Sequence, residues 1–266
     1  MLHKVLNGHS GCKVLLCEND KTKYVRKISK SFDYNTRLQA QMKKQDSFFH
    51  SNILSPKIYS SGNKDNLFYF DMEYISGISL SEFIRQNTVH QIEPIIEKVF
   101  SHLFESRKSY IVDTAHEIDL KIEKISEFLS DDYNIYKNYC RDYDWKNTEI
   151  NCCHGDLTFE NIMIYKGNIY FIDFLDSFIE SHLIDVSKIM QDLLIGWSWR
   201  FSETHPFIKS QYIYESLKSR LTSCEMETCK RLLVLNLLRI VPYTTDKNTS
   251  AFINNKLKHL RKVFKI

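Results

Sequence analysis

Residues 153–177 read CHGDLTFENIMIYKGNIYFIDFLDS, and this stretch decides the fold. The apolar, β-prone runs 161–165 and 169–174 flank a Lys-Gly-Asn turn, so the pattern predicts a strand, a tight turn and a second strand. Three oxygen-bearing side chains lie at the ends of these strands: Asp156, Asn161 and Asp173. Two such groups can hold a divalent cation on phosphate oxygens while the third faces a substrate hydroxyl.

The same stretch resembles the protein-kinase-like fold, in the branch of the aminoglycoside phosphotransferases, choline kinases and bacterial sugar kinases. His154-Gly155-Asp156 with Asn161 is similar to the catalytic loop of that fold, and Ile172-Asp173-Phe174 to its metal-binding motif. The resemblance implies ATP and Mg²⁺, with Asp156 as the catalytic group that orients the acceptor hydroxyl and accepts its proton. It also implies Asn161 and Asp173 as the metal ligands. A buried His and Asp that only fix a turn would not account for three oxygen groups at strand ends.

The resemblance implies an α+β chain with two lobes. We expect residues 1–75 to form a small, mainly β lobe and residues 76–266 a larger, helical lobe. The chain has 266 residues, 43% of them hydrophobic and 26% charged, which is ample for a core and ordinary for a globular protein. Apolar residues at helical spacing predict helices in the second part, in the ranges 91–108, 119–139, 206–221, 225–241 and 250–265.

The N-terminal strands carry the expected nucleotide-binding groups. A glycine-bearing turn between the first two predicted strands can bring backbone N–H groups close to phosphates, and it contributes Gly8, Ser10 and Gly11. Lys27 lies in the next strand, at the position of the phosphate-binding lysine of the resemblance, with Arg26 as the competing candidate. Adenine is expected to contact the backbone near Glu73 and Ile75, where a strand ends.

One departure from the kinase pattern concerns the partner of Lys27. That lysine normally pairs with a glutamate on the following helix, but the sequence has no glutamate between Glu18 and Glu73. The predicted helix 36–49 offers Gln39, Gln41, Gln45 and Asp46, and of these we expect Gln41 to hold Lys27. If it does, Gln41→Glu should be tolerated or beneficial.

The acceptor is expected among the later helices, because aromatic faces and arginine forks suit sugars and anions. Asp185 matches a structural acid that braces the catalytic loop in the resemblance. The stretches HGDLTFENI, IDFLDSF and LIDVSKIMQDL look most like bacterial phosphotransferases associated with surface polysaccharides, which implies a sugar or glycan precursor as acceptor. Ordinary packing or surface charge is the competing interpretation of the predicted acceptor residues, which are Asp192, Trp197, Arg200 and Arg239.

Two other functions stay open. An antibiotic kinase would need an acidic cleft for a cationic drug, and a non-catalytic nucleotide-binding protein would account for the missing glutamate. A net charge of +3 without a strong basic run argues against nucleic acid. No apolar run is long enough to span a membrane, and seven scattered cysteines suggest a reducing compartment, so we expect a cytoplasmic protein. The sequence leaves the oligomeric state open.

Overall fold

A computed structural model describes residues 2–6, 11–18, 22–105, 109–202, 204–244 and 246–266. Its chain forms two compact units. Unit 1 consists of Met1–Phe83 and Glu160–Asp176, and unit 2 consists of Ile84–Phe159 and Ser177–Ile266. Helix α2 (Leu80–Gln86) contains the first boundary. Each unit is described by itself.

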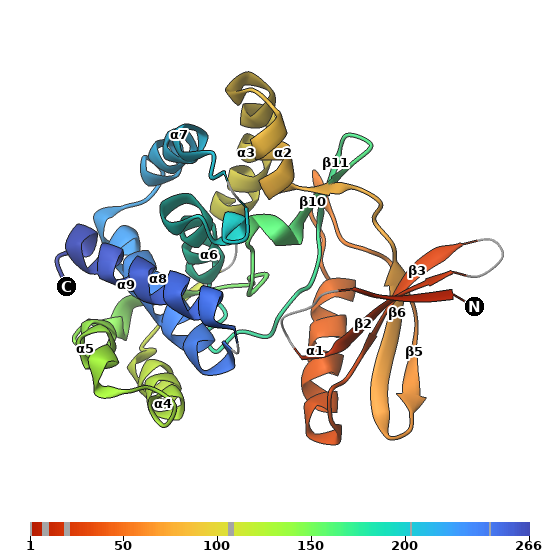
Figure 1. The fold of residues 1–266 in the computed structure, drawn as a ribbon, viewed down its shortest axis with the longest axis horizontal. Coiled ribbons are helices and arrows are strands. Elements are labelled where there is room, and N and C mark those ends of the chain that lie inside the picture. Colours follow the sequence, from red (N-terminus) through yellow and green to blue (C-terminus); the bar gives the residue numbers. More distant parts are fainter. Residues whose placement is uncertain (1, 7–10, 19–21, 106–108, 203, 245) are drawn as a thin grey trace. The chain divides into compact units, whose positions relative to one another are not determined.

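Unit 1 is built on a five-stranded antiparallel sheet in the order β1-β2-β3-β6-β5 (Figure 1). The strands are β1 (Leu2–Leu6), β2 (Lys13–Glu18), β3 (Lys23–Ile28), β5 (Ile58–Lys64) and β6 (Leu67–Glu73). Helix α1 (Asn35–Asp46) packs on one face, where Leu38 meets Val25 and Phe70 in a buried cluster. Because side chains alternate along a strand, Lys27 shares this helix-covered face with Val25, and Arg26 lies on the other.

A second sheet of unit 1 combines residues far apart in the sequence. It has the order β4-β11-β10-β7, with β4 (Ile53–Leu54) parallel to β11 (Asn168–Phe171) and β7 (Ile78–Ser79) antiparallel to β10 (Ile162–Tyr165). The strand-turn-strand prediction for 161–174 is confirmed, although β11 ends before Asp173. These pairings place Glu160–Asp176 in unit 1, so the unit is discontinuous and differs from a linear division at residue 75.

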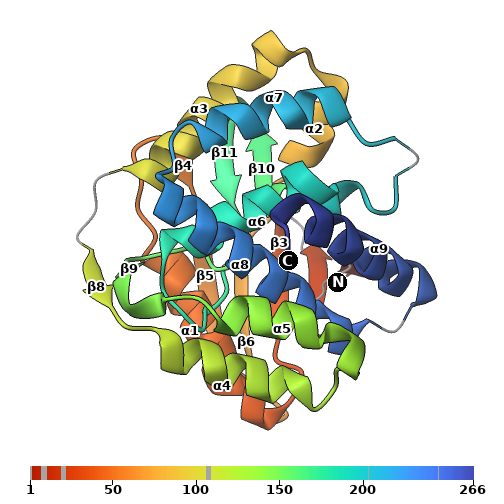
Figure 2. The same cartoon turned by 90° about the vertical axis from the view of Figure 1, so that its left-hand side faces the viewer.

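Unit 2 is mainly helical (Figure 2). A short antiparallel pair joins β8 (Tyr110–Val112) to β9 (Thr148–Ile150). The predicted helix 119–139 is instead two helices, because Ser130, Asp131 and Asp132 favour a turn and a 3₁₀ turn at Asp131–Tyr133 separates them. The helices are α3 (Val89–Phe104), α4 (Ala115–Ser126), α5 (Asn134–Arg141), α6 (His182–Ile195), α7 (Phe207–Lys218), α8 (Ser223–Ile240) and α9 (Lys247–Phe264).

Helix α6 is the centre of unit 2. Nearly every one of its residues is buried, and it packs against α7 and α8 (Figure 2). The Ser181 side chain caps its first turn, and Gly196 ends it in the left-handed conformation at φ +72. A helix buried on all sides cannot keep its polar residues in water, so an unpaired polar group there is costly. Asp185, Lys188 and Asp192 of α6 have protein partners, whereas both polar atoms of the Gln191 side chain lack a hydrogen-bond partner among the described residues.

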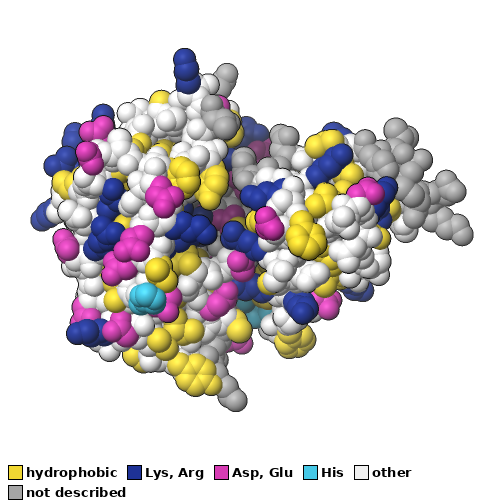
Figure 3. Space-filling view, turned by 90° about the horizontal axis from the view of Figure 1, so that it is seen from below, with side chains coloured by type: hydrophobic (Ala, Val, Ile, Leu, Met, Phe, Trp, Pro, Cys, Tyr) yellow, Lys and Arg dark blue, Asp and Glu magenta, His cyan; other side chains and the backbone are white. Residues whose placement is uncertain are grey.

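Acidic and basic side chains are interspersed over the surface of unit 2 in the view of Figure 3. Among the described residues, we find no helix that combines the length and the apolar character needed to cross a membrane.

Candidate functional site

Two buried acids of α6 accept hydrogen bonds from the backbone of the loop that carries Asp156. Asp185 accepts the backbone N–H groups of His154 at 2.6 Å and Gly155 at 2.8 Å, so its predicted role as a brace is confirmed. Asp192 accepts the N–H of Phe159 at 2.5 Å through Oδ2 and that of Ser198 at 2.8 Å through Oδ1. The loop thus takes its shape from charge-assisted hydrogen bonds to a rigid helix.

This geometry corrects one predicted acceptor residue. The side chain of Asp192 is fully buried, with a relative exposure of 0%, and backbone donors occupy both of its oxygens. The side chain therefore has no exposed surface on which an acceptor molecule could bind. Because nearly the whole of α6 is buried, Asp192 lies inside unit 2 and not at its surface.

A lysine of α6 faces the proposed catalytic carboxylate. Lys188 Nζ lies 2.9 Å from Asp156 Oδ1, and the lysine is buried at 8% exposure. Burial alone would raise the pKa of Asp156, but the charge and hydrogen bond of Lys188, with smaller contributions from His154 and Arg239, lower it below its usual value. Asp156 is therefore held as an anion. Sequence reasoning missed Lys188, although its helical spacing from Asp185 gave the signal.

The other predicted acceptor residues lie in unit 2, where Trp197 is buried and Arg200 and Arg239 are partly buried. The Arg200 guanidinium stacks over Trp197, 4.2 Å from the ring centroid, and donates to the carbonyl of Trp197 at 2.8 Å. Arg239 lies over the Phe178 ring at 4.8 Å and donates to Asn236 Oδ1 at 3.1 Å. Of these residues, Arg239 is the one whose charge acts on Asp156.

In unit 1, Lys27 contacts two oxygen groups at once. Its ammonium donates to Asp173 Oδ1 and, at 3.3 Å, to Gln41 Oε1. Lys27 is buried at 3% exposure, which opposes its charge, but the nearby Asp173 carboxylate raises its pKa above the ordinary value overall. The predicted contact between Lys27 and Gln41 is confirmed. Arg26 is instead paired on the opposite sheet face with Asp71, through two hydrogen bonds of 2.6 and 2.7 Å.

Gln41 connects Lys27 to a second acid that the sequence reasoning missed. Its Nε2 donates to Asp176 Oδ1 at 3.3 Å and to the Tyr34 hydroxyl at 3.2 Å, which orients Oε1 toward Lys27. Asp176 also pairs with Arg37 at 2.7 Å. In place of the negative charge of a helix glutamate, Lys27 thus meets the amide dipole of Gln41, which is itself hydrogen-bonded to the Asp176 carboxylate. A glutamate at position 41 would face Asp176 as a like charge, so the expected tolerance of Gln41→Glu is withdrawn.

The donor set of unit 1 fits a hard cation such as Mg²⁺. Asp173 has its side chain 36% exposed, and among the described residues its Oδ2 has no partner. Asn161 begins the hairpin, and its backbone carbonyl accepts the N–H of Ile172 at 3.0 Å, which ties the two predicted ligands to one short segment. Asp173 has φ +61, a conformation that is uncommon for residues other than glycine and that often accompanies functional sites.

The remaining predicted nucleotide-binding residues have different outcomes. Gly8 and Ser10 lie outside the described residues. Gly11 has φ +75, which favours glycine, and is exposed. Glu73 ends β6 and is partly buried, and Ile75 follows it in a buried position. Contacts of the backbone with adenine stay a prediction for both.

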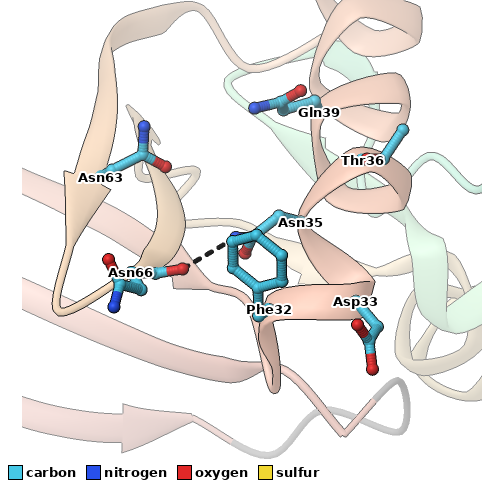
Figure 4. A pocket seen from close by; sticks show the side chains of 7 residues that line it. All are labelled: Phe32, Asp33, Asn35, Thr36, Gln39, Asn63 and Asn66. Atoms are coloured by element: carbon cyan, nitrogen blue, oxygen red, sulfur yellow. Dashed lines mark hydrogen bonds between the residues drawn. The ribbon is translucent and has the colours of Figure 1, made fainter.

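A surface hollow of unit 1 involves none of the predicted site residues (Figure 4). It lies between the start of α1 and the β5–β6 hairpin, where Asn35 Nδ2 donates to the carbonyl of Asn66 at 2.8 Å. Asn35 also accepts the N–H of Phe68, so its side chain serves to join helix and hairpin. We assign the hollow no role in the chemistry.

One further group of potential metal ligands lies in unit 2. Side-chain atoms of Glu149, His182 and Glu225 are within 4.8 Å of one another. Asn151 Oδ1 accepts the backbone N–H of His182 at 2.6 Å, which leaves Asn151 Nδ2 to donate to the ring atom Nδ1 of His182 at 2.9 Å. A neutral imidazole that accepts at Nδ1 carries its proton on Nε2, whereas a histidine that binds metal through Nε2 needs Nδ1–H. The network therefore favours hydrogen bonding over a metal.

Neither a family model nor a curated protein matches the sequence. Solved structures do match the fold. Aminoglycoside phosphotransferase APH(4)-Ia, in a ternary complex with ADP and hygromycin B, has a TM-score of 0.67 at 12% identity and is matched over 98% of this chain and 93% of its own. Choline kinase LicA from Streptococcus pneumoniae has a TM-score of 0.60 at 15% identity, over 98% of this chain and 94% of its own.

A choline/ethanolamine kinase family protein from Mesorhizobium loti has a TM-score of 0.55 at 12% identity, over 100% of this chain and 89% of its own. The likeness extends over the whole chain in all three cases. The chain therefore has the α+β, protein-kinase-like fold of the aminoglycoside phosphotransferases and choline kinases, as the resemblance implied. Identities this low establish the fold and leave the acceptor to be argued from the residues.

Proposed function

We propose that this protein transfers the γ-phosphoryl group of ATP to a hydroxyl group of a small molecule. The proposal rests on two charged side chains that the structure holds in place. In unit 2, Lys188 keeps Asp156 anionic, and in unit 1, Lys27 is held between Asp173 and Gln41. Both lie in the motifs that the sequence resemblance assigns to phosphoryl transfer. Positioning and charge neutralisation supply most of the catalysis in such reactions.

Each group has one role in the proposed step. Asp156 accepts a hydrogen bond from the acceptor hydroxyl and takes its proton as the oxygen bonds to the γ-phosphorus. The bond from that phosphorus to the bridging oxygen breaks, and ADP leaves with the electron pair. Lys27 binds phosphate oxygens. Asn161 and Asp173 would hold Mg²⁺, which neutralises phosphate charge when bound.

The acceptor we propose is a sugar or glycan precursor. The sequences of the motifs support this class, because they resemble those of bacterial phosphotransferases associated with surface polysaccharides. The guanidinium of Arg200 stacked on Trp197 supports it as well, since aromatic and arginine faces suit sugars and anions. The competing class is an aminoglycoside, the kind of molecule bound in the ternary complex of aminoglycoside phosphotransferase APH(4)-Ia. Two acids of unit 2 that an acidic cleft would need are used locally: Asp131 accepts from Asn134, and the side chain of Asp144 caps the turn at Trp145–Asn147. These contacts favour the sugar.

The test is ADP release in the presence of ATP and Mg²⁺, screened against sugars, amino alcohols and aminoglycosides. Asp156→Asn should retain nucleotide affinity and lose turnover by about 10²–10⁴-fold, the usual effect of removing a general base. Stimulation by aminoglycosides alone would select the competing acceptor class. A protein that binds nucleotide but releases no ADP with any acceptor, and whose behaviour Asp156→Asn does not change, would be non-catalytic.

A further inference from the structure

Lys188 is an unusual lysine because the helix that carries it has almost no contact with water. It is 8% exposed, in the middle of α6, and its ammonium lies 2.9 Å from Asp156 Oδ1. A buried ammonium is costly unless it is paired. Its charged partner among the described residues of unit 2 is Asp156, the carboxylate to which we assign the acceptor proton.

The contact belongs to a series of three between α6 and the catalytic loop. Asp185 holds the N–H groups of His154 and Gly155, Lys188 holds the side chain of Asp156, and Asp192 holds the N–H of Phe159. At 100° per residue, the three α6 residues lie within about 60° of one another on the helix surface. They meet the loop in the order of its sequence. Asp185 and Asp192 fix the backbone of the loop, whereas Lys188 contacts its functional group, the Asp156 carboxylate.

We propose that Lys188 is a positioning residue for phosphoryl transfer, which keeps the Asp156 carboxylate anionic and in one orientation. This inference rests on the proposed function. A free aspartate side chain rotates about two bonds, whereas one with Oδ1 fixed by a buried ammonium presents Oδ2 in a defined direction. Misplacement of a reacting group by about 1 Å can cost a hundredfold in rate. Lys188 thus acts on the reaction through Asp156.

Among the described residues, the charged or titratable groups that act on Asp156 include Lys188 from α6, His154 from the loop itself and Arg239 from α8. Lys188 has the largest attractive effect and lowers the pKa of Asp156, opposing the increase that burial causes. The sign follows directly. Without Lys188 the pKa of Asp156 rises, so the carboxylate is protonated at a higher pH and turnover falls earlier on acidification.

The experiment compares Lys188→Met, Lys188→Arg and Lys137→Met in the full-length protein. Lys137 of α5 is the matched control, because it is also 8% exposed and forms no ion pair or hydrogen bond within the described part of the chain. For Lys188→Met, kcat at neutral pH should fall by about ten- to a hundredfold while the KM for ATP stays constant. The acidic limb of its pH profile should move to higher pH, because a close opposite charge that lowers the pKa of Asp156 is gone. Lys188→Arg should restore much of kcat and much of the normal position of the acidic limb. Lys137→Met should change neither kcat nor the acidic limb.

Titration of the Asp156 carboxyl by ¹³C NMR provides a readout that does not need turnover. The titration of Asp156 should move upward in Lys188→Met and stay in place in Lys137→Met. An unshifted Asp156 titration, or a normal kcat in Lys188→Met, would overturn the role of Lys188. Absence of ADP release from the wild-type protein with every acceptor would instead overturn the proposed function, and the two failures are therefore distinguishable.

Discussion

At the scale of single residues, Gln41 shows how this chain manages without the glutamate that usually pairs with the phosphate lysine. Its amide accepts from Lys27 on one side and donates to Asp176 and Tyr34 on the other. The amide cannot turn without losing these bonds, so its oxygen stays directed at Lys27. The hydrogen bond from the amide nitrogen to the Asp176 carboxylate polarises the amide and makes that oxygen a stronger acceptor. The acid near Lys27 is therefore Asp176, in the segment after Asp173, and not a residue of the helix. The neutral side chain of Gln41 connects Asp176 to Lys27.

This relay predicts that Gln41→Glu lowers activity, although it restores the usual residue type. The new carboxylate would lie about 3.3 Å from Asp176 Oδ1 and would lack a proton to donate, and like charges this close disfavour the ionised pair. We expect about a tenfold loss in kcat/KM for ATP, equal to about 1.4 kcal/mol. Adding Asp176→Asn should recover most of it, because the asparagine can donate to the new carboxylate.

The matched control is Gln39→Glu on the same helix. Gln39 forms no hydrogen bond within the described residues and lines the hollow of Figure 4, so the added charge should leave the KM for ATP unchanged. An active Gln41→Glu protein that gains nothing from Asp176→Asn would show that Asp176 does not act through Gln41.

Asp173 gives a prediction about metal dependence. Asp173→Ala removes both the proposed Mg²⁺ ligand and the charged partner of Lys27, and it should abolish the increase in nucleotide affinity that Mg²⁺ produces. Asn161→Ala removes a neutral ligand, so its effect should have the same direction and a smaller size. Nucleotide titrations with Mg²⁺ and with a chelator measure both. Retained Mg²⁺ dependence in Asp173→Ala would place the cation elsewhere.

At the scale of elements, the close approach of β7 and β10 depends on one glycine. A Cβ built on Gly77 would lie 2.3 Å from the carbonyl oxygen of Ile164, a backbone atom that cannot move aside. Ile164 pairs with Ile78 at this point, so the sheet itself excludes a side chain here. This steric demand, rather than a flexible hinge, explains why glycine stands at position 77.

Gly77→Ala should therefore destabilise unit 1 more than Gly167→Ala does. Gly167 has φ +77 but nothing within 4 Å of its Cβ position, so alanine there adds only backbone strain, about 1–2 kcal/mol. Overpacking at Gly77 should cost about 1–3 kcal/mol or more, with separation of β7 from β10. Denaturant unfolding of the two variants compares the costs. A smaller loss for Gly77→Ala would mean that β7 can shift away freely.

At the scale of the whole molecule, the sequence predicted local elements and motif residues better than long-range partners. The hairpin 161–174 and the contact of Lys27 with Gln41 follow from strand alternation, helix geometry and motif spacing. Lys188 was missed because a lysine in an amphipathic pattern indicates solvent, and burial of α6 depends on packing by α7 and α8. The pairing of β4 with β11 was missed because β4 has only two residues and therefore carries no periodic signal.

The discontinuous unit 1 leads to a prediction about cooperative opening. Ile53 of β4 is buried at 1% exposure and pairs with Ile169 of β11, more than a hundred residues away in the sequence. Ile53→Ala should cost about 2–5 kcal/mol, and elements that open together exchange their amide hydrogens together. We expect faster native-state exchange throughout β10 and β11, with little change in α6 and α8.

Leu233→Ala in α8 is the reciprocal variant, since Leu233 is fully buried in unit 2. It should speed exchange in α6 and α8 and leave β10 and β11 protected, although these strands lie between two segments of unit 2 in the sequence. The comparison is made by hydrogen exchange on the full-length protein at low denaturant. If β10 and β11 respond to Leu233→Ala and ignore Ile53→Ala, their stability follows chain neighbours, and unit 1 is not a cooperative unit.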